Sequence, residues 1–288
     1  MLAALSAVAA HLPPGLPQYR IKLGPFIVPP TQMVGLVISA RINGGPPLRL
    51  LLDSGAQDIV LDRKVAEKSR CAGQGDLDLV AAGVPAARVV KVQRAETIQV
   101  GELTLHDLPV VIEDRRLADG IQGALPLSIF AGYVIRLDIP AKTLDLLPYP
   151  LERDEPAGAI ESIANHHVVF VKGTANGSGR GHFLIDTGAS YNAISRIMAK
   201  ELGISETMAE HVSVEAGTAP LDAAILRGLV DLRVGSQQLP ADPTIVVDLA
   251  MASRYHGIEI SGLIGFPALR GSVLTVSYRD SFVRIEPR

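Results

Sequence analysis

The chain has 288 residues, a formal net charge of −3, and a composition that is 48% hydrophobic and 20% charged. The apolar content excludes a disordered chain, and the nearly neutral charge gives no electrostatic basis for nucleic-acid binding. A single cysteine, Cys71, excludes an internal disulfide and a cysteine-based zinc cluster. With 27 glycines, 20 prolines and only 4% aromatic residues, the composition favours short strands and turns. We therefore predict a mostly β protein of one or two domains.

The N-terminus has two interpretations. Residues 2–10 are small and apolar, and residues 7–9 match a signal-peptide cleavage pattern, but the positively charged start of a signal peptide is missing. If the segment is a signal peptide, the protein is periplasmic or secreted. If it is an ordinary extension, the protein is cytoplasmic. No apolar run approaches the roughly 18–20 residues that span a bilayer.

The first half of the chain carries a strand–turn–strand pattern that ends at an aspartate. Residues 36–42 have strand composition, and Asn43-Gly44 is a strong hairpin signal. Residues 48–52 form an apolar return strand that delivers Asp53 at its end. Further strands are predicted at residues 89–92, 97–100, 103–105, 110–112, 134–138 and 144–146.

The second half begins with the same pattern. Residues 168–171 and 183–185 are predicted strands, and Asp186 follows the second of them. The glycine-rich segment 177–181 leads into a strand rather than a helix, so it predicts a hairpin tip and not a phosphate-binding loop. His166-His167 is expected at the start of the first strand, where adjacent side chains point to opposite faces and make poor metal co-ligands.

A short helix is predicted after these strands. Ser195 is a suitable N-cap for a helix over residues 196–202, and Gly203 ends it. The closing strands at residues 273–277 and 283–285 match those at residues 134–138 and 144–146 at an offset of 139.

The chain contains an internal repeat. Residues 43–61 match residues 176–194 at an offset of 133, which pairs Asp53 with Asp186. Weaker matches continue at offset 134, and we align residues 120–123 with residues 262–265 at offset 142. This last alignment predicts about eight extra residues in the second half, near residues 251–257.

The repeat predicts two lobes joined by a linker. Residues 148–160 begin with a proline-rich, charged stretch that is typical of a linker. We assign residues 33–147 to an N-terminal lobe, residues 161–288 to a C-terminal lobe, and residues 1–32 to an N-terminal extension that contains the signal or pro-segment candidate.

The paired aspartates point to acid–base chemistry. A carboxylate after a buried strand is costly unless it is hydrogen-bonded or shares a proton. Gly55 and Gly188 let each backbone turn sharply, and the hydroxyls of Ser54 and Thr187 can fix the turns. Two related halves place equivalent residues across a shared axis, so the two carboxyls could face each other.

At this point the sequence resembles the aspartic peptidases of the pepsin–retropepsin type, whose facing carboxyls share one proton. Their pattern is two apolar residues, Asp-Thr/Ser-Gly, and downstream two apolar residues and Gly. The first element matches residues 51–56 and 184–189, and the second matches residues 263–265. In the first half the second element is assigned to residues 121–123, where the polar Gln122 departs from the pattern and puts the packing behind Asp53 in question.

The resemblance implies a bilobal, single-chain, retropepsin-like acid protease fold built from two repeated β-barrel-like lobes with short helices. Ala56 and Ala189 stand where pepsins usually carry a serine that donates to the catalytic carboxylate, so the dyad pKa should rise. Residues 63–112 contain no Tyr, Phe or Trp, so the aromatic flap residue of pepsins is absent. By resemblance, small-residue flaps turn at Ala82-Gly83 and Ala216-Gly217.

The resulting hypothesis is an aspartic endopeptidase. Asp53 and Asp186 would activate water, Ser54, Gly55, Thr187 and Gly188 would hold the carboxylates, and the cleft would bind an extended peptide. We expect no metal, no cofactor, no nucleic acid and a monomer. Two alternatives remain: a catalytically silent peptide- or protein-binding module on the same fold, and an unrelated β-sandwich with structural Asp turns.

Overall fold

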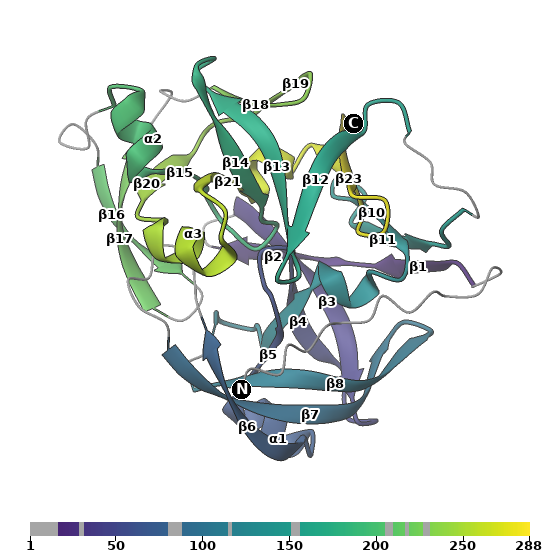
Figure 1. Cartoon of the computed structure of the whole chain (residues 1–288). Helices are drawn as coiled ribbons and strands as arrows, with labels where there is room; N and C mark the ends of the chain where they lie inside the picture. The colour runs from purple at the N-terminus through teal and green to yellow at the C-terminus, as the bar shows by residue number, and fades with distance from the viewer. Residues whose placement is uncertain are drawn as a thin grey trace.

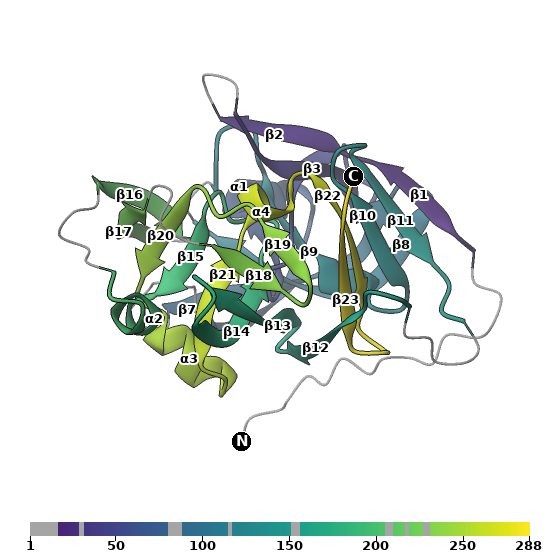
Figure 2. The same ribbon diagram turned by 90° about the horizontal axis from the view of Figure 1, so that it is seen from above.

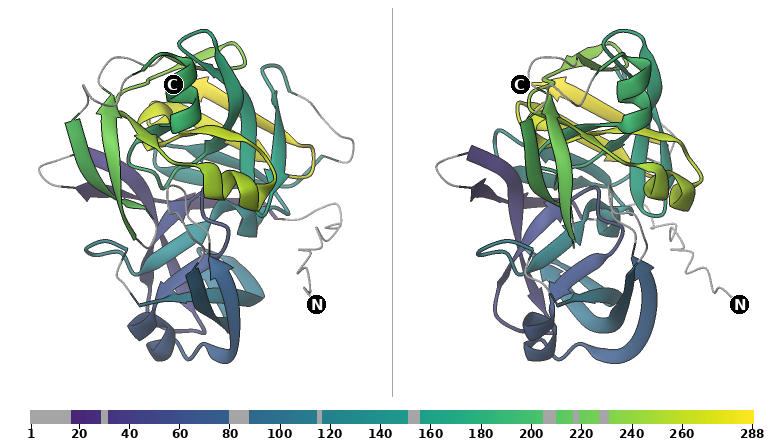
Figure 3. Two further views of the ribbon diagram at one scale, coloured as in Figure 1. Left: turned by 60° about the vertical axis from the view of Figure 1, so that its left-hand side comes forward. Right: turned by 90° about the vertical axis from the view of Figure 1, so that its left-hand side faces the viewer.

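The strands of the chain form two sheets, and the molecule has two lobes. The computed structural model describes residues 17–28, 32–79, 88–114, 117–150, 156–204, 210–216, 219–226 and 231–288. One sheet has eight strands and the other fifteen. Figures 1 and 3 show the purple and blue N-terminal lobe below the green and yellow C-terminal lobe. The predicted mostly β, bilobal fold is confirmed.

The eight-stranded sheet makes the N-terminal lobe. Its strand order is β2-β3-β4-β9-β5-β8-β7-β6, and a second pairing of β3 with β7 curls it toward a barrel. The strands predicted at residues 89–92 and 97–100 are one long strand, and those at 103–105 and 110–112 are another, because their ladder is nearly continuous. The bounds are β2 Gly24–Val28, β3 Gln32–Ile42, β4 Leu48–Asp53, β5 Ile59–Asp62, β6 Ala72–Leu79, β7 Arg88–Val100, β8 Leu103–Glu113 and β9 Gly123–Pro126.

The C-terminal lobe repeats this arrangement within the larger sheet. Strand β14 pairs in parallel with β21, and β15 pairs in parallel with β20, as β4 does with β9 and β5 with β8. The bounds are β12 Ile160–Asn165, β13 Val168–Ala175, β14 Gly179–Ile185, β15 Asn192–Ser195, β16 Glu210–Ala216, β17 Ala219–Leu226, β18 Leu232–Val234, β19 Gln237–Leu239, β20 Thr244–Val247 and β21 Ile260–Ile264.

An antiparallel run of six strands, in the order β1-β11-β10-β22-β23-β12, joins the lobes (Figure 2). Equivalent strands of the two halves, β10 and β22, meet at its centre, where Arg136 pairs with Thr275, its counterpart at offset 139. This pairing is the signature of a local two-fold axis. The remaining bounds are β1 Tyr19–Lys22, β10 Val134–Asp138, β11 Thr143–Leu147, β22 Ser272–Ser277 and β23 Phe282–Pro287.

Residues 17–28, which precede the predicted N-terminal lobe, contribute to both sheets. Strand β1 pairs with β11 in the shared sheet, and β2 pairs with β3 in the N-terminal lobe. The division at residues 32, 147 and 160 therefore stays our proposal for the domain organisation. The signal-peptide candidate lies outside the described residues.

The two Asn-Gly hairpins are built alike. Asn43 and Gly44 have φ angles of 50° and 70°, and Asn176 and Gly177 have 48° and 70°, the positive values that a tight two-residue hairpin turn requires. Each asparagine side chain also accepts the backbone N–H of a residue in a neighbouring segment, Thr97 at 3.0 Å and Asp231 at 2.8 Å. The repeat thus preserves a turn together with its anchor.

The histidine pair does not begin a strand, contrary to the prediction. His166 and His167 have φ angles of 45° and 71° and form the turn between β12 and β13. Left-handed backbone is uncommon for residues other than glycine, although histidine adopts it more readily than most. The turn was missed because the sequence has neither glycine nor asparagine at these two positions.

The helices are short, and Figure 1 shows α1 in the N-terminal lobe and α2 and α3 in the C-terminal lobe. The predicted cap is present, because the Ser195 hydroxyl accepts the backbone N–H of Met198 at 3.0 Å. Of the helices in the described part of the chain, none has the length and apolar character needed to cross a membrane. The bounds are α1 Arg63–Lys68, a 3₁₀ turn Leu127–Phe130, α2 Arg196–Glu201, α3 Ala250–His256 and α4 Phe266–Leu269.

Candidate active site

Both motif aspartates lie where a buried strand ends. Asp53 is the last residue of β4, and Asp186 directly follows β14. In each turn, Oδ1 of the aspartate accepts the backbone N–H groups of the residues two and three positions further along, so the two carboxyls are held in the same way. The donors are Gly55 and Ala56 at 2.9 and 3.1 Å, and Gly188 and Ala189 at 3.0 and 2.9 Å.

The two carboxyl groups hydrogen-bond to each other between the lobes. Glycine permits this approach: a Cβ on Gly55 would lie 2.5 and 2.7 Å from the carboxylate oxygens of Asp186. A Cβ on Gly188 would lie 2.5 and 2.6 Å from those of Asp53. Each motif glycine therefore makes room for the aspartate of the other lobe.

The environment of the pair favours retention of a proton. Burial raises the pKa of Asp53, against the opposing effect of its backbone N–H donors. Burial also raises the pKa of Asp186 well above its ordinary value, and the charge of Asp53 adds to the shift. Because two carboxyls in contact cannot both ionise easily, the pair shares one proton over a range of pH.

Ser54 and Thr187 link the two turns through four buried hydrogen bonds. Each hydroxyl accepts the backbone N–H of the other residue, at 3.0 Å for Thr187 Oγ1 and 2.9 Å for Ser54 Oγ. Each hydroxyl also donates at 2.8 Å to a carbonyl of the opposite lobe, Ser54 to Ile185 and Thr187 to Leu52. The sequence predicted hydroxyls that fix their turns, and the structure adds that each one fixes the turn of the other lobe.

The downstream element of the first lobe is three residues later than predicted. Strand β9 pairs with β4 so that Leu52 lies opposite Leu125 and Asp53 opposite Pro126, whereas β21 pairs Ile185 with Ile264. The true counterpart of residues 263–265 is therefore residues 124–126, at offset 139. The second half has five extra residues here rather than eight, since fourteen residues separate Val247 from Gly262 and nine separate Glu113 from Gly123.

Gln122 consequently does not stand in the pattern. Its backbone N–H donates to the Arg49 carbonyl at 2.9 Å, and its side-chain Oε1 accepts the Arg49 N–H at 2.9 Å. The polar side chain continues the ladder at the edge of β4, and Leu125 fills the buried position that Gln122 was expected to occupy. The doubt about packing behind Asp53 is thereby removed.

The real departure in the first lobe is Pro126, which stands where the second lobe has Gly265. The Gly265 N–H donates to Oδ1 of the fully buried Asn192 at 3.0 Å. The counterpart of Asn192 at offset 133 is Ile59, which offers no acceptor. Proline has no N–H to donate. The C-terminal lobe therefore has both a donor and an acceptor at this point, in Gly265 and Asn192. The N-terminal lobe has neither, because Pro126 and Ile59 occupy the equivalent positions.

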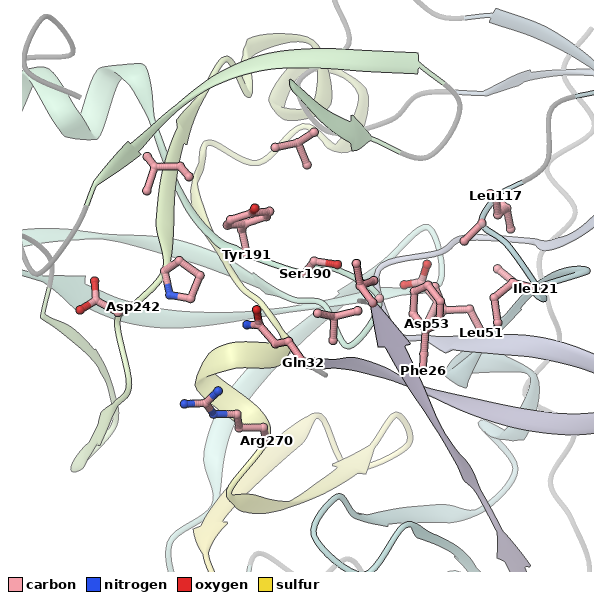
Figure 4. A pocket seen from close by; sticks show the side chains of 18 residues that line it. Phe26, Gln32, Leu51, Asp53, Leu117, Ile121, Ser190, Tyr191, Asp242 and Arg270 are labelled. Atoms are coloured by element: carbon pink, nitrogen blue, oxygen red, sulfur yellow. The ribbon is translucent and has the colours of Figure 1, made fainter. Parts of the chain in front are cut away.

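A pocket of about 800 Å³ adjoins the aspartates. Its walls come from β2 and β3, from the segment before β9, and from the hairpin of β16 and β17. Asp53 lies on it beside apolar side chains, and Tyr191, Asp242 and Arg270 lie apart from Asp53 (Figure 4). The apolar lining includes Phe26, Leu51, Leu117, Ile121, Val214 and Ile225.

The predicted flap turns belong to two hairpins. Strands β6 and β7 pair over residues 72–94, and β16 and β17 pair up to Ala216 and Ala219. Ala82, Gly83 and Gly217 lie outside the described residues, so the flap assignment stays a prediction.

A polar group of residues near the end of the first motif was not foreseen. Asp58 is half-buried, which raises its pKa, and the charge of His167 opposes this shift. The His167 Nδ1–H donates to the Gln57 carbonyl at 3.0 Å, and the ring centroids of His166 and Tyr255 are 4.7 Å apart. Only the fold could reveal the contact of His167 with Gln57, because 110 positions separate the two residues.

Over the described ranges, no three His, Cys, Asp or Glu side chains are grouped so that they could hold a metal ion. Two carboxyls that share a proton can act together as a general base and a general acid. A two-lobed β protein with such a pair at the lobe boundary has the architecture of an acid protease.

Comparison with known proteins identifies the family. A sequence profile described as "Aspartyl protease" matches residues 38–127 and 171–268, which contain both motifs, so the chain belongs to the aspartyl protease family. The crystal structure of an aspartic proteinase from Irpex lacteus is similar with a TM-score of 0.58 over 94% of this chain and 97% of that chain, at 11% identity, and it supports the fold. No curated protein sequence gives a match.

Proposed function

We propose that this protein is an aspartic endopeptidase whose catalytic residues are Asp53 and Asp186. The observation that carries the proposal is the direct hydrogen bond between two carboxyls with raised pKa values, each held by an equivalent turn. Membership of the aspartyl protease family supports a peptidase that acts on peptide or protein substrates.

The mechanism follows from the shared proton. The ionised carboxyl removes a proton from a water molecule bound between the two aspartates, and that water attacks the carbonyl carbon of the peptide bond. The protonated carboxyl donates to the carbonyl oxygen. The tetrahedral intermediate collapses when the carboxyl that took the proton from water passes it to the amide nitrogen. The C–N bond then breaks, and the hydroxyl proton of the intermediate returns to the other carboxyl, which restores the shared proton. Ser54, Gly55, Thr187 and Gly188 act as positioning residues, because they hold the carboxyls in contact.

The substrate fits as an extended chain. The apolar pocket beside Asp53 accepts hydrophobic side chains on one side of the scissile bond, and the β6–β7 and β16–β17 hairpins are the elements that would cover the chain. Main-chain hydrogen bonds from strand edges would then bind peptides in a largely sequence-independent way.

The test is cleavage of a mixed peptide library, analysed by mass spectrometry. The wild-type protein should cleave, and Asp53→Asn and Asp186→Asn should each lower kcat/KM by about 1,000-fold or more while retaining the wild-type circular dichroism spectrum. Asp107→Asn is the matched control, because Asp107 is exposed with φ of 60°, where asparagine is well tolerated. Wild-type activity in either dyad variant would refute the assignment.

The pH optimum should be mildly acid rather than strongly acid. Ala56 and Ala189 donate backbone N–H groups but have no hydroxyl for the ionised carboxyl, and burial raises the pKa of both aspartates. A rate that still climbs at very low pH would contradict this expectation.

A silent peptide-binding module is the competing hypothesis. Two features of the sequence favour it: the polar Gln122 assigned to the first-lobe pattern, and the absence of an aromatic flap residue. The first no longer applies, because Leu125 occupies that position. Binding of library peptides without cleavage at any pH between 3 and 8 would favour the module over the enzyme.

A further inference from the structure

Arg270 is a basic residue at the edge of a largely apolar pocket. It follows α4 and precedes β22, and its exposed side chain lines the pocket that contains Asp53. In Figure 4 its guanidinium group lies apart from Asp53, so it is remote from the bond that the dyad would cleave. More than 80 positions separate it from the second motif, so only the fold brings it here.

The guanidinium group has no protein partner in the part of the chain that the structure describes: no hydrogen bond and no ion pair holds it. Two carboxyls share the pocket with it. Asp242 has an interaction of its own elsewhere, and Asp53 is bound to Asp186 and to its turn. Among the described lining residues, Arg270 is therefore a positively charged group that no protein carboxylate pairs with.

Such a group is suited to a carboxylate. Arginine presents a planar fork that matches both oxygens of a carboxylate. We propose that Arg270 is a specificity-determining residue that binds a carboxylate of the substrate, at a position remote from the scissile bond. This proposal rests on the proposed peptidase function. The carboxylate comes from an Asp or Glu side chain or from a free C-terminus.

The experiment measures kcat/KM for matched peptides. The parent peptide is one that the wild-type protein cleaves, with an acetylated N-terminus and an amidated C-terminus. Glu, Gln or Lys is placed in turn at each position from two to four residues away from the scissile bond, on both sides. A second series ends in a free carboxylate at the same distances, which separates the two sources of the group.

We expect the wild-type protein to prefer Glu over Gln, or a free C-terminus over an amide, by about tenfold at one position. Arg270→Gln should abolish this preference, and Arg270→Glu should reverse it in favour of Lys. High salt should weaken it. Arg180→Gln is the control, because Arg180 is exposed on the β13–β14 hairpin, is not part of the pocket and carries the same charge.

Equal rates for Glu and Gln at every position, together with no effect of a free C-terminus, would overturn the proposal. So would a preference that persists in Arg270→Gln. If the wild-type protein cleaves no peptide, the proposed function fails, and the parent is instead a blocked library peptide that the wild-type protein binds. Fluorescence anisotropy with its Glu, Gln and free C-terminal variants then decides the role of Arg270. A tenfold weaker affinity of Arg270→Gln for the carboxylate peptides supports it, and equal affinities refute it.

Discussion

The two halves of the chain agree closely around the aspartates and differ two residues beyond the motif. Ser190 and Tyr191 line the apolar pocket, whereas their counterparts at offset 133, Gln57 and Asp58, contact a histidine turn of the opposite lobe. A pair of carboxyls that share a proton is served best by matching surroundings, which a two-fold axis provides. A peptide has a direction and no such axis, so the surfaces that bind it must differ. The repeat is retained where the chemistry is symmetric and lost where the substrate is not.

The largest effect should come from breaking the symmetric part. Gly55→Ala or Gly188→Ala would place a methyl group against the opposite carboxyl and separate the aspartates. Because misplacement of a reacting group by about 1 Å costs on the order of 100-fold in rate, each variant should lose at least about that much kcat/KM. Gly271→Ala is the control, because a Cβ there meets no atom within 4 Å. Near-normal activity in either motif variant would show that the close contact of the carboxyls is not needed.

Exchanging the residues that differ between the lobes should have very unequal effects on stability. Gly265→Pro removes the N–H that Asn192 accepts and brings atoms against the Tyr191 carbonyl, so it should lower the free energy of unfolding by about 2–5 kcal/mol. Pro126→Gly leaves no acceptor unsatisfied and should cost only about 0.5–1 kcal/mol, through the entropy of the unfolded chain. Urea denaturation measures both, and equal losses would contradict the Asn–Gly and Ile–Pro pairing.

The hydroxyls of Ser54 and Thr187 should contribute equally to the free energy of unfolding. Ser54→Ala and Thr187→Ala each leave a buried N–H and a buried carbonyl of the other lobe without a partner, and each should cost about 2 kcal/mol. The double variant should cost less than the sum, because the first change already loosens the contact. Ser54→Thr and Thr187→Ser, which keep the hydroxyl, are the matched controls. Strict additivity would mean that the two turns are not coupled.

The smallest expected effect is on how the free energy of unfolding depends on pH. The pKa of Asp186 is raised by folding, so the folded state binds more protons than the unfolded chain, and stability falls as the pH rises through that pKa. Asp186→Asn removes this loss. The variant should therefore be more stable than the wild-type protein at pH 7, and the gain should shrink as the pH approaches 4. Asp53→Asn should behave with the same sign. A gain that is independent of pH would show that the dyad does not titrate in this range.

Local signals in the sequence were sufficient for the two Asn-Gly hairpins, for the helix cap at Ser195 and for each Asp-Ser/Thr-Gly motif, because each depends on residues close together in the chain. The alignment of residues 120–123 with 262–265 was wrong because both segments begin and end with glycine, while the true counterpart ends in Pro126. The hydrogen bond between Gln57 and His167 and the placement of Arg270 on the pocket arise from long-range packing. Neither has a local signal that could have predicted it.

The crossed hydroxyl bonds have a consequence for protein synthesis. Ser54 finds the partners of its side chain only at residues 185–187, so a nascent chain that ends before them lacks these bonds and keeps only the local backbone donors to Asp53. Neither half alone contains both Asp53 and Asp186. If Asp53 and Asp186 are the catalytic pair that we propose, activity would require both motifs to be synthesised and both lobes to be docked. An unfinished polypeptide would then lack the proposed active site.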